Sequence, residues 1–253
     1  MLRRIALTVG GMMLGVAVAA AYVQTVDPVE YENRNLTLHE ALILAWSRGD
    51  VAGIREAADQ LISREPGGPG AADAKLLLAF TEETLPAARD RLTTVRREYP
   101  GTVWEREALL SEARLHLLWN EPALALVKLQ AAEAVAAPPN EQSRVIIDPA
   151  EIAERLVSLY LSQGMLSGAG PILDEYRDRT LPSARRIRFL YLEAVWHARN
   201  NRPDDAERIL NDLLVKYPGA ELAGDAQDLL REIGRYSLPA GDLSNLPATL
   251  PLE

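Results

Sequence analysis

Helical segments that end in proline recur along this chain, and this repetition constrains its fold more than any other feature. The prolines that end them are Pro66, Pro100, Pro138, Pro182 and Pro218. Successive intervals are 34, 38, 44 and 36 residues. Repeats of this length are typical of helical solenoids, in which each unit buries its apolar face only against its neighbours. The repeat therefore predicts an all-α array of helix pairs.

Composition agrees with helices and argues against several classes of protein. The chain has 253 residues, enough for one large domain or one repeat array. It carries 27 basic and 36 acidic residues, a formal net charge of −9, which argues against a general nucleic-acid binder. It contains no cysteine, which excludes disulfides, thiolate metal ligands, a cysteine nucleophile and a lipid-modified cysteine.

The amino terminus predicts a membrane segment. Residues 1–4 carry Arg3 and Arg4, and residues 5–23 are uncharged. A helix over residues 5–23 would be about 28 Å long, close to the thickness of a bilayer's hydrocarbon core. The positive-inside rule would keep residues 1–4 in the cytoplasm and export the remainder. Two interpretations stay open: an uncleaved anchor, which the length favours, and a signal peptide cleaved near Ala19.

Small residues recur every four positions within this segment. Gly11, Gly15 and Ala19 would share one face of a helix. Such a face lets a second transmembrane helix approach closely, which makes the three residues candidates for helix packing. The simpler explanation is that glycine and alanine are common in membrane helices and signal sequences.

The rest of the chain divides into a linker over 24–36, a repeat array over 37–235 and an extended tail rich in leucine and proline over 236–253. Thr37 and Glu40 have the spacing of a capping box that opens the array. We expect five helix pairs and one capping helix. The predicted helices are 37–48 and 51–65, 71–83 and 86–98, 102–119 and 122–136, 149–163 and 167–179, 183–200 and 203–216, and 220–235.

The third and fifth pairs repeat each other at a distance of 81 residues. The matching positions are Glu112, His116, Asn120 and Pro122 in one pair and Glu193, His197, Asn201 and Pro203 in the other. Four return helices carry a small residue early in their sequence, at Ala88, Ala125, Ala169 and Ala206. An alanine at that point lets the two helices of a pair cross closely.

Together the period, the early alanine and the terminal Tyr217-Pro218 resemble the tetratricopeptide repeat family over residues 37–235. The family's glycine in the first helix is replaced by Leu76, Ala113 and Ala194. The resemblance implies a right-handed superhelix that binds other proteins. Tyr217-Pro218-Gly219 before an alanine-rich helix is similar to bacterial envelope members of the family.

Several side chains are candidate partner contacts. The insertion 138–149 carries Val145, Ile146 and Ile147, which we expect to pack on the array or on a partner. The tail carries Leu243, Leu246 and Leu250, through which it would dock into a partner or back on the array, although disorder is the default for such a sequence. Further candidates are Trp46, Trp119 and Trp196, as partner anchors or core residues, and Arg185 and Arg186, facing an acidic partner, lipid headgroups or solvent.

No catalytic, cofactor or metal site is predicted. The three histidines, His39, His116 and His197, lack the spacing of a metalloprotease motif. His116 and His197 occupy equivalent positions two units apart, too far to ligate one ion. Carboxylates are scattered along helices opposite arginines, as at Glu151 and Arg155.

The sequence therefore predicts a non-catalytic scaffold with protein partners and no nucleic acid or metal. Residues 5–23 would hold it in a bacterial inner membrane as a single-pass protein, with the repeats in the periplasm. The partners would be other subunits of a larger inner-membrane complex, an energy-transducing one being an option. The alternatives are a soluble periplasmic adaptor after signal cleavage, or an α-helical enzyme or solute-binding protein, for which a closed polar pocket would be the mark.

Overall fold

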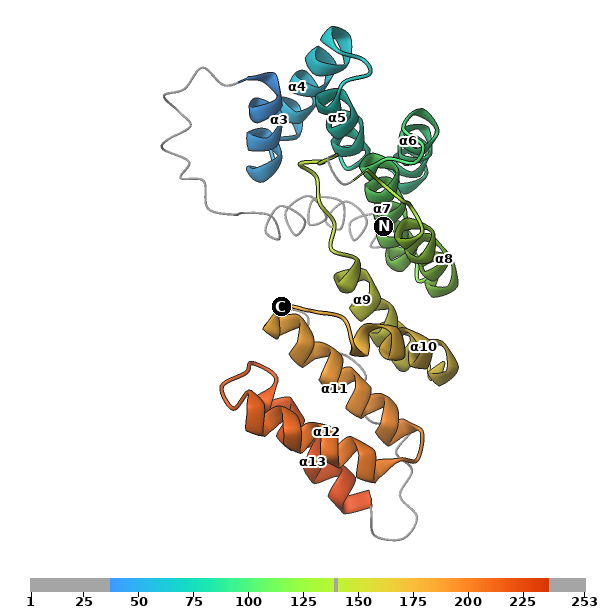
Figure 1. Ribbon diagram of the computed structural model, residues 1–253, viewed down its shortest axis with the longest axis vertical. Helices are drawn as coiled ribbons and strands as arrows, with labels where there is room; N and C mark the ends of the chain where they lie inside the picture. The colour runs from blue at the N-terminus through green and yellow to red at the C-terminus, as the bar shows by residue number, and fades with distance from the viewer. Residues whose placement is uncertain (1–36, 139–140, 237–253) are drawn as a thin grey trace, which may run out of the picture. The chain divides into compact units, whose positions relative to one another are not determined.

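Eleven helices and no strand make up the part of the chain that the computed structural model describes, residues 37–138 and 141–236 (Figure 1). They follow one another in five pairs and a final helix. The pairs are α3 (Leu38–Ser47) with α4 (Val51–Arg64), α5 (Pro69–Ala79) with α6 (Leu85–Glu98), α7 (Val103–Leu118) with α8 (Pro122–Glu133), α9 (Pro149–Ser162) with α10 (Leu166–Arg177), and α11 (Ser183–Arg199) with α12 (Pro203–Lys216). The final helix is α13 (Ala223–Tyr236).

The predicted fold class needs one correction. In the described ranges no helix is both long and apolar enough to cross a membrane. The longest of them, α11, has 17 residues, fewer than the roughly 20 that span a hydrocarbon core. The helix predicted over 5–23 falls outside the described residues. The described part of the chain is therefore all-helical and has no membrane-spanning helix, and the right-handed superhelix stays a prediction.

Four turns inside the helix pairs share one hydrogen-bond pattern. The backbone is left-handed at Gly49, Asn120, Gly164 and Asn201, with φ of 67, 60, 70 and 55°. In the last of these, the amide of Asn201 donates to Ala198 O at 3.2 Å, and that of Arg202 donates to His197 O at 3.0 Å. This Schellman motif satisfies the last carbonyls of a helix, and its left-handed residue is usually glycine or asparagine.

The chain forms two compact units. The first consists of the described residues up to Leu115 together with Val127–Ile147, and the second of His116–Leu126 and the residues from Asp148 onward. The dividing points fall inside α7 and α8, so this pair contributes residues to both units.

Helix α5 forms the centre of the first unit. It contacts α3, α4 and α6, and nearly all its residues are buried, including Leu76 and Leu77. Trp46 of α3 packs on Phe80 with ring centroids 5.4 Å apart. An alanine-rich helix suits this position because small side chains allow neighbours to approach from several sides. The capping box predicted at Thr37 and Glu40 is present at the start of α3.

Helix α11 has the central position in the second unit, where it contacts α9, α10, α12 and α13. Its Leu192, Ala194 and Val195 are fully buried. Helix α10 approaches its neighbours closely through glycines: a Cβ at Gly168 would lie 2.8 Å from the Tyr160 ring of α9.

An ion pair recurs between successive helix pairs. In the first unit Arg96 of α6 donates to Glu112 of α7 at 3.2 Å, and in the second unit Arg177 of α10 donates to Glu193 of α11 at 3.0 Å. Both arginines and both glutamates are separated by the same 81 residues as the other repeated positions. A buried carboxylate needs a charged partner or several hydrogen-bond donors, and the arginine supplies them here, so this pair is part of the repeat itself.

Candidate peptide-binding face of the first unit

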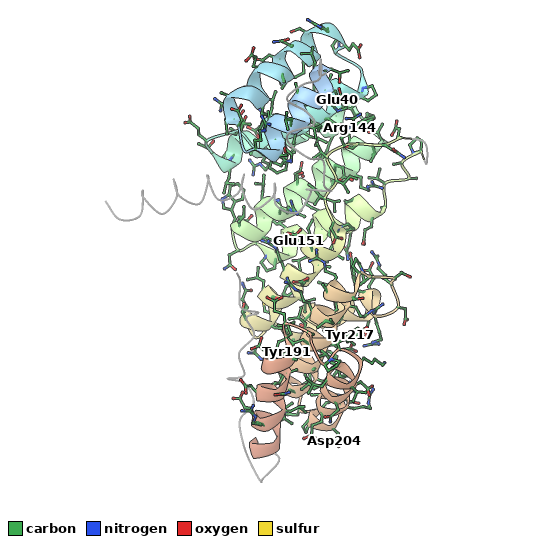
Figure 2. All side chains as sticks on the ribbon, turned by 90° about the vertical axis from the view of Figure 1, so that its left-hand side faces the viewer. Glu40, Arg144, Glu151, Tyr191, Asp204 and Tyr217 are labelled. Atoms are coloured by element: carbon green, nitrogen blue, oxygen red, sulfur yellow. The ribbon has the colours of Figure 1, made fainter. Side chains whose placement is uncertain are left out.

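A segment without helix or strand, residues 141–147, is hydrogen-bonded to α5 and α7, the first helices of two pairs, and we call it the strap (Figure 1). Its side chains alternate between inside and outside. Ser143, Val145 and Ile147 are buried, whereas Arg144, labelled in Figure 2, and Ile146 are exposed. A period of two is the pattern of an extended chain lying on a surface.

Asp73 of α5 holds the strap in place. Its side chain is fully buried and accepts four hydrogen bonds. Two come from the strap, from Ser143 Oγ at 2.6 Å and from the amide of Arg144 at 3.0 Å. Two come from helices, from Trp104 Nε1 of α7 at 2.7 Å and from His39 Nε2 of α3 at 2.9 Å. Because a carboxylate only accepts, the proton on His39 lies on Nε2.

Two further carboxylates fix the ends of the strap. Glu107 of α7 is buried and accepts the amide of Ile147 at 2.7 Å. Burial raises the pKa of Glu107, whereas the Ile147 amide and Arg106 act in the opposite direction. At the other end Glu141 accepts the amide of Val103 at 3.1 Å, at the first residue of α7, where a negative charge is favourable.

These contacts define a binding face made of Asp73, Trp104 and Glu107 with His39, which we call the α3–α5–α7 face. Trp104 and Glu107 are three residues apart on α7 and therefore share a side of that helix. The carboxylates accept main-chain amides and a hydroxyl, and the strap side chains Val145 and Ile147 are buried. The face thus holds this segment of the chain by its backbone and by its alternate side chains.

The residues predicted in the insertion divide between core and surface. Val145 and Ile147 pack on the array, as one of the two expectations had it, and Ile146 between them is 55% exposed. The predicted tryptophans also differ. Trp46 is a core residue, whereas Trp119 and Trp196 are half-buried.

Trp119 and Trp196 each lie against a histidine. The ring of His116 meets Trp119 edge-on at 6.1 Å, and the ring of His197 meets Trp196 at 4.9 Å. Trp196 Nε1 also donates to Leu166 O at 2.9 Å. This bond fixes the Trp196 ring against α10.

The predicted arginine cluster is engaged within the second unit. Arg185 bonds Glu154 at 2.8 Å and Asp148 at 2.9 Å, and Arg186 donates to main-chain carbonyls at Arg177 and Arg179. Arg185 therefore connects α11 to the start of α9, and Arg186 connects α11 to the end of α10 and the turn after it. Gly11, Gly15, Ala19, Leu243, Leu246 and Leu250, also predicted as contact residues, lie outside the described residues.

Sequence reasoning missed Asp73, Trp104, Glu107 and Ser143. One signal was available: Asp73 is the single acidic residue in the alanine- and leucine-rich α5. A lone carboxylate in a helix that apolar residues surround has to find partners. The partners themselves come from distant parts of the chain, which no local pattern predicts.

A mixed-charge pocket of about 580 Å³ lies in the second unit among α10, α11 and α12. His197 lines it, and the buried Nδ1 of this ring has no hydrogen-bond partner. A carboxylate oxygen of Asp205 lies 3.8 Å from Nδ1. Burial lowers the pKa of His197, and the charge of Arg202 adds to this effect.

The charges around this pocket largely neutralise one another. Its lining contains four acidic and four basic residues, and several are bonded across it: Arg177 pairs with Glu193 at 2.8 Å, and Arg202 pairs with Asp205 at 2.7 Å. The hydrogen bond from Arg208 and the charge and hydrogen bond of Arg202 lower the pKa of Asp205. The pocket thus presents an ion-pair network rather than a surplus of one charge.

Comparison with protein-family models, with curated proteins and with solved structures finds no match for this chain. Within the described residues no group of three or more histidine, aspartate or glutamate side chains is placed to hold a metal ion. The α3–α5–α7 face is the best-defined candidate site because its geometry already contains a bound segment.

Proposed function

We propose that this chain is a non-catalytic, tetratricopeptide-like interaction protein that binds an extended segment of a partner protein on its α3–α5–α7 face. The observation that carries the proposal is the strap itself. It lies on this face with alternate side chains buried and with two main-chain amides bonded to buried carboxylates. A face that holds one extended segment in this way has the contacts to hold another of the same pattern.

The placement of the carboxylates supports recognition rather than mere packing. Asp73 and Glu107 are almost completely buried, so each would be costly without hydrogen-bond donors. The strap supplies three of these donors, namely Ser143 Oγ and the amides of Arg144 and Ile147. Bonds to an ionised acceptor are stronger than neutral ones and depend on the position of the backbone.

The test uses the full chain with Val145→Asp and Ile147→Asp, which we call the unseated variant, because two buried charges prevent the strap from docking. The probe is a fluorescent peptide with the sequence of residues 141–148. We expect saturable binding with a Kd on the order of 10 μM, which corresponds to about 7 kcal/mol. Fluorescence anisotropy measures this affinity, and circular dichroism checks that the variant remains helical.

Two matched controls make the result specific. A peptide with aspartate in place of its own valine and final isoleucine should bind at least about tenfold more weakly, because it cannot bury those side chains. Asp73→Asn in the unseated variant should have a similar effect, since it removes a charged acceptor. Asp59→Asn changes an exposed carboxylate on α4 and should leave the affinity unchanged. Equal binding of both peptides, or of neither, would contradict the proposal.

A further inference from the structure

We infer that the strap is an internal pseudo-ligand, which occupies the α3–α5–α7 face and competes with a partner segment of the same pattern. This inference rests on the proposed function and adds to it both a regulatory contact and the chemistry of the partner. The partner segment has a small hydroxyl residue followed, two and four positions later, by β-branched aliphatic residues. These are the positions of Ser143, Val145 and Ile147.

The strap belongs to a connection longer than the fold requires. Fifteen residues, 134–148, join α8 to α9, whereas four to six residues join the other successive pairs and α13. The connections between the other helix pairs show that four to six residues are enough to join one pair to the next. The additional length therefore serves the strap, which can leave the face while the helices stay where they are.

Both buried carboxylates of the face keep some of their partners when the strap leaves. Asp73 keeps two donors from the helices, Trp104 Nε1 and His39 Nε2. Glu107 keeps its ion pair with Arg106 at 3.1 Å. Water can reach the remaining oxygen positions once the strap is gone, so the open face does not leave an isolated buried charge. This arrangement allows two states that differ in the strap rather than in the helices.

The strap buries few apolar side chains on the face. Only Val145 and Ile147 bury aliphatic side chains in it, and Ile146 between them points outward. A partner segment that repeats these contacts gains the same bonds. It has to compete with a tethered segment whose effective concentration is on the order of 1 mM. For an intrinsic Kd of about 10 μM, this tether weakens binding roughly 100-fold.

The experiment compares three full chains with the fluorescent 141–148 peptide: the natural chain, the unseated variant and Ile146→Asp. The last is the matched control, because it adds a charge to the strap at an exposed position. We expect the unseated variant to bind about 100-fold more tightly than the other two, which should have equal affinities. Saturating peptide should also speed hydrogen exchange at strap amides of the natural chain, notably Ile147.

The possible outcomes separate this inference from the proposed function. Equal affinity in all three chains would overturn the competition while the binding face stands. No binding to the unseated variant would remove the binding face and the competition together. If the double aspartate variant does not fold, Val145→Ala with Ile147→Ala replaces it, with an expected affinity gain of at least about tenfold. No gain in that folded variant would likewise overturn the competition.

Discussion

At the scale of single residues, the two repeated histidines show how one position acquires different surroundings. Nδ1 of His116 lies 2.8 Å from a carboxylate oxygen of Glu121. At the equivalent positions 81 residues later, the histidine is His197 and the glutamate is replaced by Arg202. Its Nδ1 is buried without a hydrogen-bond partner. Burial and Arg202 lower the pKa of His197, so the folded protein binds fewer protons there than the unfolded chain. Stability from this residue is present above about pH 6.5 and is lost as the pH falls through the folded pKa.

The first prediction is that Arg202→Glu raises the pKa of His197. The substitution removes a nearby positive charge and supplies the carboxylate that His116 already has. It should also reduce the loss of stability between pH 7.5 and pH 5.5, because the folded and unfolded pKa values become closer. Titration of the His197 ring by NMR measures the effect. Arg155→Glu, at an exposed site on α9, is the control, and an unchanged or lower pKa in Arg202→Glu would refute the argument.

At the scale of elements, close approach of helices decides which small residues are required. Gly168 allows α10 to lie against Tyr160 of α9, and Gly170 lies against Trp196 of α11, where a Cβ would be 3.0 Å from the indole ring. The early small residues of the return helices predict this kind of crossing. Whether one of these small residues can be replaced by a larger one depends on the helix that packs against it. The sequence of α10 alone therefore does not show which of its positions require glycine.

The second prediction concerns Gly168→Ala. Helix propensity favours alanine by about 1 kcal/mol, but the new Cβ would lie 2.8 Å from the Tyr160 ring. We expect the clash to prevail and the free energy of unfolding to fall by about 1–3 kcal/mol. A Cβ added at Gly224 in α13 would have no atom within 4 Å apart from its chain neighbours and the backbone of its own helix. Gly224→Ala should therefore be neutral or stabilising by up to about 1 kcal/mol. Urea unfolding measures both, and stabilisation by Gly168→Ala would show that α10 can move away.

At the scale of the whole molecule, the division into two units predicts that local damage stays local. Arrays of helix pairs gain stability from neighbour contacts, so the loss from one cavity declines with distance along the array. Leu192 lies in the core of the second unit, and Leu76 lies in the core of the first. Both leucines are fully buried.

The third prediction follows from these two leucines. Leu192→Ala should cost about 2–5 kcal/mol and lower hydrogen-exchange protection in α11 to α13, with a small effect on α3 to α6. Leu76→Ala is the reciprocal control and should expose α3 to α6 instead. A uniform loss of protection in either variant would mean that the two units open as one. Mass spectrometry of peptic peptides resolves the two regions.

The sequence by itself determined the features that depend on residues a few positions apart. Thr37 caps α3, asparagine or glycine makes the left-handed turns, proline begins the return helices α8 and α12, and the repeat sets the number of pairs. Interactions between residues close in the sequence decide these features, so the features can be predicted from the sequence alone. The predicted membrane helix was the error in the fold class, since no helix among the described residues fits it.

Only the tertiary structure decided the binding face. Asp73 meets Trp104, 31 residues away, and Ser143, 70 residues away, and neither separation follows from a helical period. The sequence indicated that Val145 and Ile147 would be buried, either on the array or on a partner. In the structure they are buried against the array, whereas Ile146 is exposed. A buried carboxylate takes whichever donors the fold brings to it. For that reason the site is defined by long-range contacts, whereas the scaffold is defined by local ones.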